Sequence, residues 1–403
     1  MVRKELIEKI LYAASIQRWN DHPRPVQLTE LDKQAHKMII AYVIAKFEEQ
    51  DKHKEIDWIG LIRGGFFEFL QRVVLTDLKP QVYHLMMKTA REDINACIFK
   101  DLENDLSAIG GNFQEKFRSY LFDKENNDFE KKILKASHYL ATEWEFKLIY
   151  QICPFMYGIE KTKESIENQI EDHFDLIGVQ KIALKKKSYG FIDLCGQLRF
   201  QKRWAQTPRI PETSVLGHSL IVALLSYLCS IEIGACDRRI YNNFFSALFH
   251  DLPEIITRDI VTPVKNMIEG MEDLIKKYEE NQIDNEILPL LPSSWHEEFK
   301  FLLKNLDKNR IINDGVPEYG ITDSDMKSKY NFKKFSPLDG RIIKACDHIA
   351  AFIEASSSIS HGVRSQQLFE GLENKYRKCK NMVVSGIDFG KLFDAFYPED
   401  QMN

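Results

Sequence analysis

The segment FHDLPE, residues Phe249 to Glu254, places a histidine and an aspartate inside a largely apolar stretch that runs from residue 244 to residue 256. A further histidine lies upstream in SVLGHS, and a further aspartate lies downstream in IIKACDH. Together these segments supply two imidazoles and two carboxylates, on His218, His250, Asp251 and Asp347. Such a set can hold a divalent metal ion and leave positions open for water and substrate. The alternative is that His250 and Asp251 form a polar pair at a helix end.

The ligand types narrow the choice of metal. Imidazole and carboxylate groups without a thiolate suit Mn, Fe, Co, Ni or Zn. They argue against calcium, which proteins bind through oxygen atoms alone. We therefore expect one divalent transition metal ion.

The composition is that of an ordinary globular protein. The 403 residues are enough for two domains, and 44% of them are hydrophobic while 29% are charged. A net charge of -5 gives no general attraction to nucleic acid or to a membrane surface. Seven cysteines are scattered without a CxxC pair, and the first residues lack the apolar core of a signal peptide, so we expect reduced thiols and a cytoplasmic location. The longest apolar run, Ile221 to Ile231, is too short to span a bilayer.

Helical periodicity extends along most of the chain. Apolar residues recur three and four positions apart, as in Ile7, Ile10, Leu11 and Ala14. The 13 prolines and 19 glycines gather in turns, and alternating strand patterns are nearly absent. The sequence therefore predicts an all-α fold.

The two halves of the chain share a series of motifs. IQRW at residues 16–19 is echoed by QKRW at residues 201–204, and ILKASH at 133–138 is echoed by IIKACD at 342–347. The interval from His36 to Glu68 (68 − 36 = 32) equals that from His218 to His250 (250 − 218 = 32). We therefore expect a tandem duplication of one helical module, with domains at residues 1–180 and 181–403.

The two copies differ at the metal-ligand positions. By these intervals, the first-copy counterparts of the four ligands are, in order, His36, Glu68, Phe69 and His138. Phe69 has no ligand atom, and Arg72, which stands in the place of Glu254, would repel a metal ion. We expect a first copy without a metal site, kept for structure or partner contacts. The alternative is a rearranged site made of its two histidines and Glu68.

The second copy is longer between its motifs. The surplus falls around residues 278–337, which contain turn-forming stretches such as NDG at 313–315. Such an insertion can be a lid, an interaction loop or a passive surface excursion.

At these residues the second half of the chain resembles the HD-domain phosphohydrolases, and among them the YfbR-like bacterial 5′-deoxynucleotidases. The family pattern H…HD…D appears as His218, His250–Asp251 and Asp347, preceded by Arg203–Trp204 and with TPVK at 262–265. The likeness covers about residues 190 to 400, and the first half resembles the same module in degenerate form. Gly217 departs from the acidic residue that relatives usually carry there. The resemblance implies tandem all-α HD-domain helical bundles, in which the metal ligands converge from separate helices.

The chemistry that the resemblance implies is metal-dependent hydrolysis of the phosphate monoester of (deoxy)nucleoside 5′-monophosphates. Glu254, three residues past Asp251, would share a helical face with it and act as a general base that orients water. The alternative for Glu254 is a solvent-exposed carboxylate. Asp259 resembles the family's second acidic catalytic residue, near the leaving oxygen, and its alternative is a helix cap.

Three further residues are expected to contact the substrate. Arg203 suits bidentate binding of a phosphate group. Trp204 would pack on the sugar and disfavour a 2′-hydroxyl, and Lys265 would add positive potential. The alternatives are a structural Arg-Trp pair, because residues 18–19 repeat it in the copy without a metal site, and a solvated lysine.

Other functions remain open within and outside this family. The same metal set serves enzymes that act on nucleoside triphosphates or cyclic nucleotides. A non-catalytic nucleotide-binding or scaffolding protein is the alternative from a different class. The expected partner is a small-molecule nucleotide, and the chain is expected to be a monomer with an intrachain pseudo-dimer or a homodimer, because relatives often pair.

Overall fold

The computed structural model describes residues 3–76, 78–123, 128–257 and 271–398. The chain divides into two compact units: unit 1 is Met1–Gln180 with Leu228–Gly234, and unit 2 is Lys181–Tyr227 with Ala235–Asn403. Helices make up most of the described residues, and the strands among them form two short antiparallel hairpins. The prediction of an all-α fold is therefore confirmed, whereas the tandem arrangement stays a prediction.

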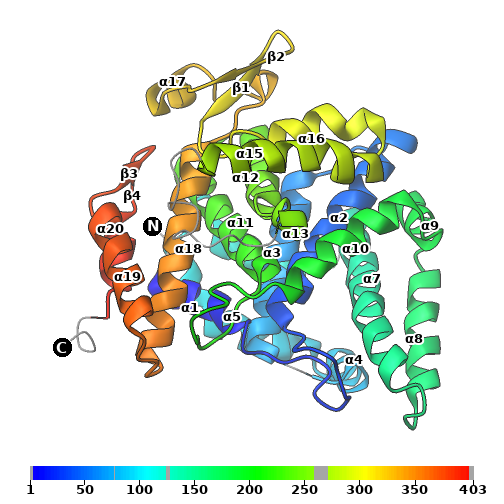
Figure 1. Cartoon of the computed structure of the whole chain (residues 1–403). Helices are drawn as coiled ribbons and strands as arrows, with labels where there is room; N and C mark the ends of the chain where they lie inside the picture. The colour runs from blue at the N-terminus through cyan, green and yellow to red at the C-terminus, as the bar shows by residue number, and fades with distance from the viewer. Residues whose placement is uncertain (1–2, 77, 124–127, 258–270, 399–403) are drawn as a thin grey trace. The chain divides into compact units, whose positions relative to one another are not determined.

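Unit 1 has two long helices at its centre, α2 and α7, which pack side by side, with α3 packed against both (Figure 1). The side chains of Thr29 and Asp57 begin α2 and α3 by accepting hydrogen bonds from backbone amides of the first turn. In chain order the helices are α1 (Lys4–Tyr12), α2 (Glu30–Asp51), α3 (Trp58–Leu75), α4 (Pro80–Thr89), α5 (Arg91–Leu106), α6 (Phe113–Phe122), α7 (Asp128–Ile152), α8 (Ile159–Glu171) and α9 (Ile177–Ala183), the last at the unit boundary.

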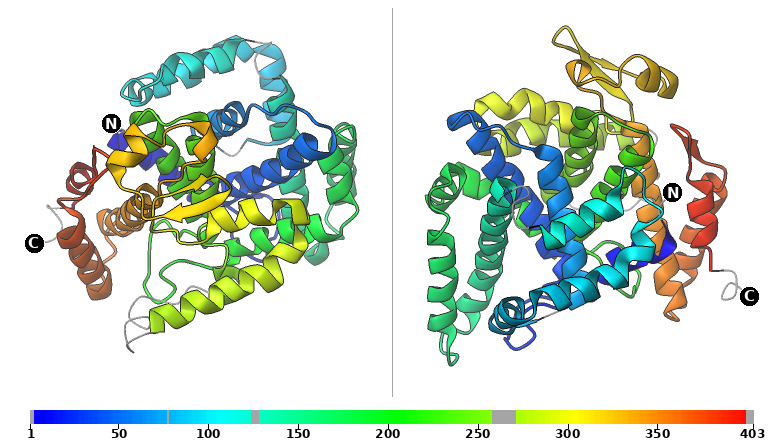
Figure 2. Two further views of the ribbon diagram at one scale, coloured as in Figure 1. Left: turned by 90° about the horizontal axis from the view of Figure 1, so that it is seen from above. Right: turned by 180° about the vertical axis from the view of Figure 1, so that it is seen from behind.

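Unit 2 begins with α10 and ends with α20. The α-helices are α10 (Lys187–Gln197), α11 (Val215–Glu232), α12 (Asp237–Phe249), α13 (Glu254–Thr257), α15 (Met271–Gln282), α16 (His296–Leu303), α17 (Asp323–Ser328), α18 (Gly340–Ser360), α19 (Gln366–Cys379) and α20 (Gly390–Ala395). The shorter elements are η1 (Leu198–Phe200), η2 (Ile283–Ile287), η3 (Leu288–Leu290), η4 (Ser293–Trp295), η5 (Lys333–Phe335), β1 (Arg310–Asn313), β2 (Val316–Tyr319), β3 (Val383–Val384) and β4 (Ile387–Asp388). Figures 1 and 2 show α18 and α19 side by side.

Helix α11 is apolar along its whole length. Its 18 residues have a mean hydropathy of 1.7, so by length and composition it can span a membrane, but 89% of it is buried inside the protein. The helix is longer than the apolar run that the sequence indicates, and length alone therefore does not exclude a span. Its burial is that of a core helix, which carries His218 into the interior of unit 2.

The first part of the insertion around residues 278–337 belongs to the core of unit 2. Trp295 is fully buried, and the ring of Phe299 lies 5.1 Å from that of Phe249 at the end of α12. The hydroxyl of Ser246 donates to the carbonyl of Leu302 over 2.6 Å. The second part carries the hairpin β1–β2 and α17, which stand at one end of unit 2 above α18 (Figure 1). The alternative that the insertion is a passive surface excursion is therefore wrong for its first part. A lid role for the hairpin stays a prediction.

Helix α12 ends at Phe249, just before the His-Asp pair. Pro253 has no amide hydrogen for the carbonyl of Phe249, so the α-helix cannot continue. Residues 251–253 form a turn instead, and the amide of Glu254 donates to the carbonyl of Asp251 over 3.0 Å. Helix α13 then begins at Glu254. The prediction that Asp251 and Glu254 share one helical face is therefore wrong.

Candidate metal centre

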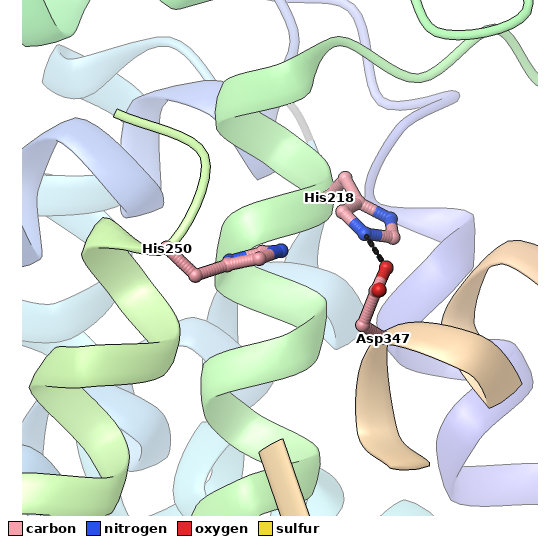
Figure 3. Close-up of side chains that lie close together, drawn as sticks. All are labelled: His218, His250 and Asp347. Carbon is pink, nitrogen blue, oxygen red and sulfur yellow. Dashed lines mark hydrogen bonds and ion pairs between the residues drawn. The ribbon is translucent and has the colours of Figure 1, made fainter. Parts of the chain in front are cut away.

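Three of the four predicted metal ligands meet inside unit 2. His218 comes from α11, His250 from the end of α12 and Asp347 from α18, and one ligand atom of each lies within 4.8 Å of the other two (Figure 3). His218 Nε2 is 3.2 Å from Asp347 Oδ1, and the two imidazole rings are 5.7 Å apart. Within the described ranges, this is the one group of three or more His, Cys, Asp or Glu side chains with the spacing of a metal site.

The hydrogen bonds of His250 leave one ring nitrogen available as a ligand. Its Nδ1 donates to the carbonyl of Ala247 over 2.7 Å, which assigns the proton to Nδ1. Its Nε2 is buried and has no hydrogen-bond partner, although Asp251 Oδ1 lies 3.2 Å away. Burial holds the pKa of His250 below its usual value. A nitrogen lone pair that faces a carboxylate oxygen needs a cation between them, and this requirement fits a metal ion.

His218 is oriented by a second buried carboxylate. Its Nδ1 lies 3.1 Å from Glu354 Oε1 and donates to it, which turns Nε2 toward Asp347. Burial disfavours the charged form of His218, but the carboxylates of Glu354 and Asp347 outweigh burial and raise its pKa. The two carboxylates therefore favour positive charge at this ring. A divalent ion at Nε2 would supply that charge in place of a proton.

Glu354 also holds the predicted substrate-binding pair. Its Oε2 accepts from Arg203 Nε over 3.4 Å and from Trp204 Nε1 over 3.3 Å, and Arg209 Nη1 lies 3.5 Å from the same oxygen. Burial opposes the charge of this carboxylate, yet the guanidinium of Arg209 and the imidazole of His218 hold its pKa well below the usual range. Glu354 was not among the residues predicted from the sequence. Its signal was a lone acid in an apolar stretch, two helical turns after Asp347.

Asp251, the fourth predicted ligand, lies at the edge of the group. One of its oxygens faces His250, and the other is 3.4 Å from Arg203 Nη1. It does not lie within 4.8 Å of all three other ligand atoms. Its role as a ligand stays a prediction, and the ion pair with Arg203 joins the candidate metal centre to the Arg-Trp pair.

Two of the other predicted site residues, Glu254 and Trp204, lie in the described part of the chain, and two do not. Glu254 is partly exposed at the start of α13, and its backbone carbonyl accepts from Gln201 Nε2 over 3.0 Å. Trp204 lies against α19, where a Cβ atom on Gly371 would be 3.4 Å from its ring. Asp259 and Lys265 lie outside the described residues.

Two lysines that the sequence analysis did not select lie near Asp347. Lys344 Nζ is 2.9 Å from Asp347 Oδ2. Lys375, on α19, donates to His348 Nδ1 over 3.1 Å and forms no ion pair within the described part of the chain. Burial lowers the pKa of Lys375, and burial together with Lys375 lowers the pKa of His348 to about 4. Lys375 was missed because its segment, ENKYRKCK, has the composition of a solvated helix face.

The same backbone arrangement, a single antiparallel bridge followed by a capping residue and here called the frame, precedes α2 in unit 1 and α11 in unit 2. Gln17 pairs with Thr29 in an antiparallel bridge, and Lys202 pairs with Ser214 in the same way. Thr29 and Ser214 each then accept a hydrogen bond from the amide three residues later, at the start of the helix. The two frames are therefore in register when Thr29 is matched with Ser214.

Each frame carries an Arg-Trp pair that binds one buried glutamate. In unit 1, Arg18 Nε and Trp19 Nε1 donate to Glu145 Oε2 over 2.9 and 3.0 Å. In unit 2, residues 203–204 bind Glu354 through the same atoms. Anchoring of the pair to a helix is thus common to both units.

This register changes the first-copy counterpart of His218. The residue four positions after the cap is His218 in unit 2 and Lys33 in unit 1, and not His36 as the intervals predict. Lys33 Nζ contacts His138 Nδ1, much as His218 contacts Asp347. The equal 32-residue intervals gave the wrong match because α2 has 22 residues and α11 has 18. Counting residues from one helix to the next therefore does not pair equivalent positions of the two units.

The rearranged metal site of His36, Glu68 and His138 is not assembled in the described residues. His36 packs edge-on against Trp144, with ring centroids 5.3 Å apart. Glu68 is paired with Lys37. A metal ion in unit 1 would have to displace Lys37 from Glu68 and Lys33 from His138.

Comparison with known proteins gives a family match in the second half of the chain and two relatives of low identity. Residues 195–375 match the family model described as HD domain. A 5′-deoxynucleotidase of Pasteurella multocida is 23% identical over 183 residues, which are 43% of this chain and 75% of that protein. A 4′-phosphooxetanocin A phosphatase of Priestia megaterium is 29% identical over 120 residues, 29% of this chain and 60% of that protein. The chain thus spans less than two thirds of the second relative.

Proposed function

We propose that this chain, which carries an HD domain over residues 195–375, is a metal-dependent phosphohydrolase that cleaves the phosphate monoester of (deoxy)nucleoside 5′-monophosphates. The HD domain and the similarity to a deoxynucleotidase and a phosphatase support a phosphohydrolase. The observation that carries the metal dependence is the group of His218, His250 and Asp347, with a buried His250 Nε2 that lacks a hydrogen-bond partner.

The protein prepares both imidazoles as ligands. Glu354 and the carbonyl of Ala247 each bind the Nδ1 hydrogen of one histidine, so both Nε2 atoms point into the centre. Asp347, and Asp251 at the edge, supply carboxylate oxygens. When bound, a divalent transition metal supplies Lewis acidity toward a phosphate oxygen and lowers the pKa of a water molecule.

Three cations are available for the substrate phosphate. Arg203 is oriented by Glu354 and Asp251, and a guanidinium suits two oxygens of one phosphate group. Lys344 and Lys375 approach Asp347 from α18 and α19. Because Lys375 forms no ion pair in the described residues, it has capacity for a phosphate oxygen.

The remaining roles follow from the sequence and stay proposals. Glu254 acts as the general base that orients water, and Asp259 protonates the departing sugar oxygen. Trp204 packs on the sugar, and Lys265 adds positive potential. The protein acts in the cytoplasm on small-molecule nucleotides, as a monomer with an intrachain pseudo-dimer or as a homodimer.

The test is phosphate release from a panel of ribo- and deoxynucleotides with Mn, Co, Mg or a chelator. Wild type is compared with Asp251→Ala and with the exposed control Asp307→Ala. The proposal predicts release from monophosphates that requires metal, is lost in Asp251→Ala and persists in Asp307→Ala. Release of pyrophosphate or triphosphate, or opening of cyclic nucleotides, would move the chain to another HD activity. Metal binding without turnover of any substrate would favour a binding or scaffolding protein.

A further inference from the structure

Lys33 is a buried lysine whose close partner is a histidine and not an acid. Its side chain is completely buried, and its Nζ contacts His138. Two of the cations beside it have a carboxylate of their own: Arg18 binds Glu30 over 2.8 Å, and Lys37 binds Glu68. Lys33 forms no ion pair within the described part of unit 1, which sets it apart from these neighbours.

Arg72 is a second cation without a carboxylate partner in the described residues. Its guanidinium lies over the ring of Tyr83, 4.4 Å from the ring centroid. It comes from α3, whereas Lys33 comes from α2 and His138 from α7, and these three helices pack against one another. Arg72 is close enough to Lys33 and His138 to influence the charge of both.

The local electrostatics favour an added negative charge. Burial, together with Arg18, Arg72 and Lys37, holds the pKa of Lys33 well below its usual range, and the carboxylate of Glu30 offsets only part of this effect. Burial and the neighbouring Lys33 likewise hold the pKa of His138 low. An anion between these groups would offset the repulsion and would accept hydrogen bonds from all three.

We propose that unit 1 binds the phosphate group of a small molecule at Lys33, Arg72 and His138, without a metal ion. By the shared cap register, Lys33 stands where unit 2 has the imidazole of His218. With a phosphate bound beside it, its amine is held in the charged form and supplies within the chain the positive charge that a metal ion is proposed to supply in unit 2. Because an ammonium does not acidify a bound water as a metal does, unit 1 holds the phosphate without hydrolysing it.

This inference does not rest on hydrolysis in unit 2, and its test avoids that reaction. Binding to the full chain is measured by calorimetry in the presence of a metal chelator, first with inorganic phosphate and then with dAMP. Wild type is compared with Lys33→Met and Arg72→Gln. The control is Lys135→Met, which removes an exposed lysine from the same helix as His138.

Loss of one charge-assisted hydrogen bond to phosphate should weaken binding by about tenfold or more. We therefore expect at least about a tenfold rise in Kd for Lys33→Met and Arg72→Gln, and wild-type affinity for Lys135→Met. Tighter binding of dAMP than of phosphate would identify a nucleotide ligand, and equal or weaker binding would identify free phosphate. Thermal melting without ligand shows which variants fold, and the partly exposed Arg72 keeps the test decisive if Lys33→Met does not fold. No binding by the chelated wild type, or equal affinity in all variants, would overturn the proposal.

Discussion

His218 Nδ1 and Glu354 Oε1 lie 3.1 Å apart, and neither side chain is exposed to solvent. The same carboxylate also receives hydrogen bonds from Arg203 and Trp204. One buried glutamate therefore supports both a candidate metal ligand and the candidate substrate contacts. Metal binding and substrate binding are expected to be coupled through it.

The variant Glu354→Gln should weaken both functions. It keeps the side-chain volume but removes the charge that stabilises the Nδ1–H form of His218. Loss of such a supporting carboxylate costs about 10- to 100-fold in metal affinity. Metal titration in competition with a chelator measures this, with the exposed Glu370→Gln as the control. Wild-type metal affinity in Glu354→Gln would show that Glu354 does not position the ligand.

Lys375→Gln should raise KM for a nucleoside monophosphate by about tenfold, because one charge-assisted contact to phosphate is lost. The turnover number kcat should change much less, since the metal ligands are untouched. Steady-state kinetics measure the two parameters separately. The matched control is Lys378→Gln, which removes an exposed lysine from the same helix. Equal KM values in the two variants would remove Lys375 from the substrate site.

Glu30 should make unit 1 sensitive to acid. Burial opposes its charge, but Arg18 and other nearby cations lower its pKa from 4.5 to about 2. Because the pKa is depressed in the folded state, this stabilisation is present above pH 4.5 and is lost as the pH falls toward 2. At pH 7, Glu30→Gln should lower the free energy of unfolding by about 3 kcal/mol.

The check for Glu30 is denaturant unfolding of wild type and Glu30→Gln at pH 7 and pH 3. The difference between the two proteins should be smaller at pH 3, where most of the Glu30 side chains in the unfolded wild type are protonated. A difference that does not change with pH would show that the ion pair with Arg18 does not depress this pKa.

The buried pair of Arg239 and Asp339 should contribute strongly to the stability of unit 2. Arg239 donates to both carboxylate oxygens, over 2.6 and 2.7 Å, just before α18 begins. Asp339→Ala would leave a buried guanidinium without its acid, at a cost of about 3–5 kcal/mol. Urea unfolding should show a smaller loss for the double variant Arg239→Met/Asp339→Leu, which removes both charges. An equal or larger loss in the double variant would argue against an uncompensated charge as the cause.

The candidate metal ligands could be predicted from the sequence because they lie within short motifs on apolar segments. His218, His250 and Asp347 come from three separate helices, and the structure brings them together. The supporting roles of Glu354 and Lys375 could not be predicted, although Glu354 stood out as a lone acid in an apolar stretch, because these roles arise from packing between elements. Only the fold reveals which side chains of α18 and α19 face the candidate metal centre.

Local chain geometry accounts for the other differences. Pro253 was visible in the sequence, and its missing amide hydrogen disfavours a helix that continues from α12 through Glu254. The matching of His36 with His218 failed because it relied on intervals across helices of unequal length. The cap residues Thr29 and Ser214 give a better register, because each is defined by its own hydrogen bond.

The most direct test of a metal centre at His218, His250 and Asp347 is the metal content of the purified full chain after reconstitution with Mn or Co. Elemental analysis should find one bound metal ion per chain in the wild type and in the exposed control Asp307→Ala. Asp347→Ala should bind none and should not release phosphate from nucleoside monophosphates. Stoichiometric metal in Asp347→Ala, or phosphate release by metal-free wild type, would contradict the account.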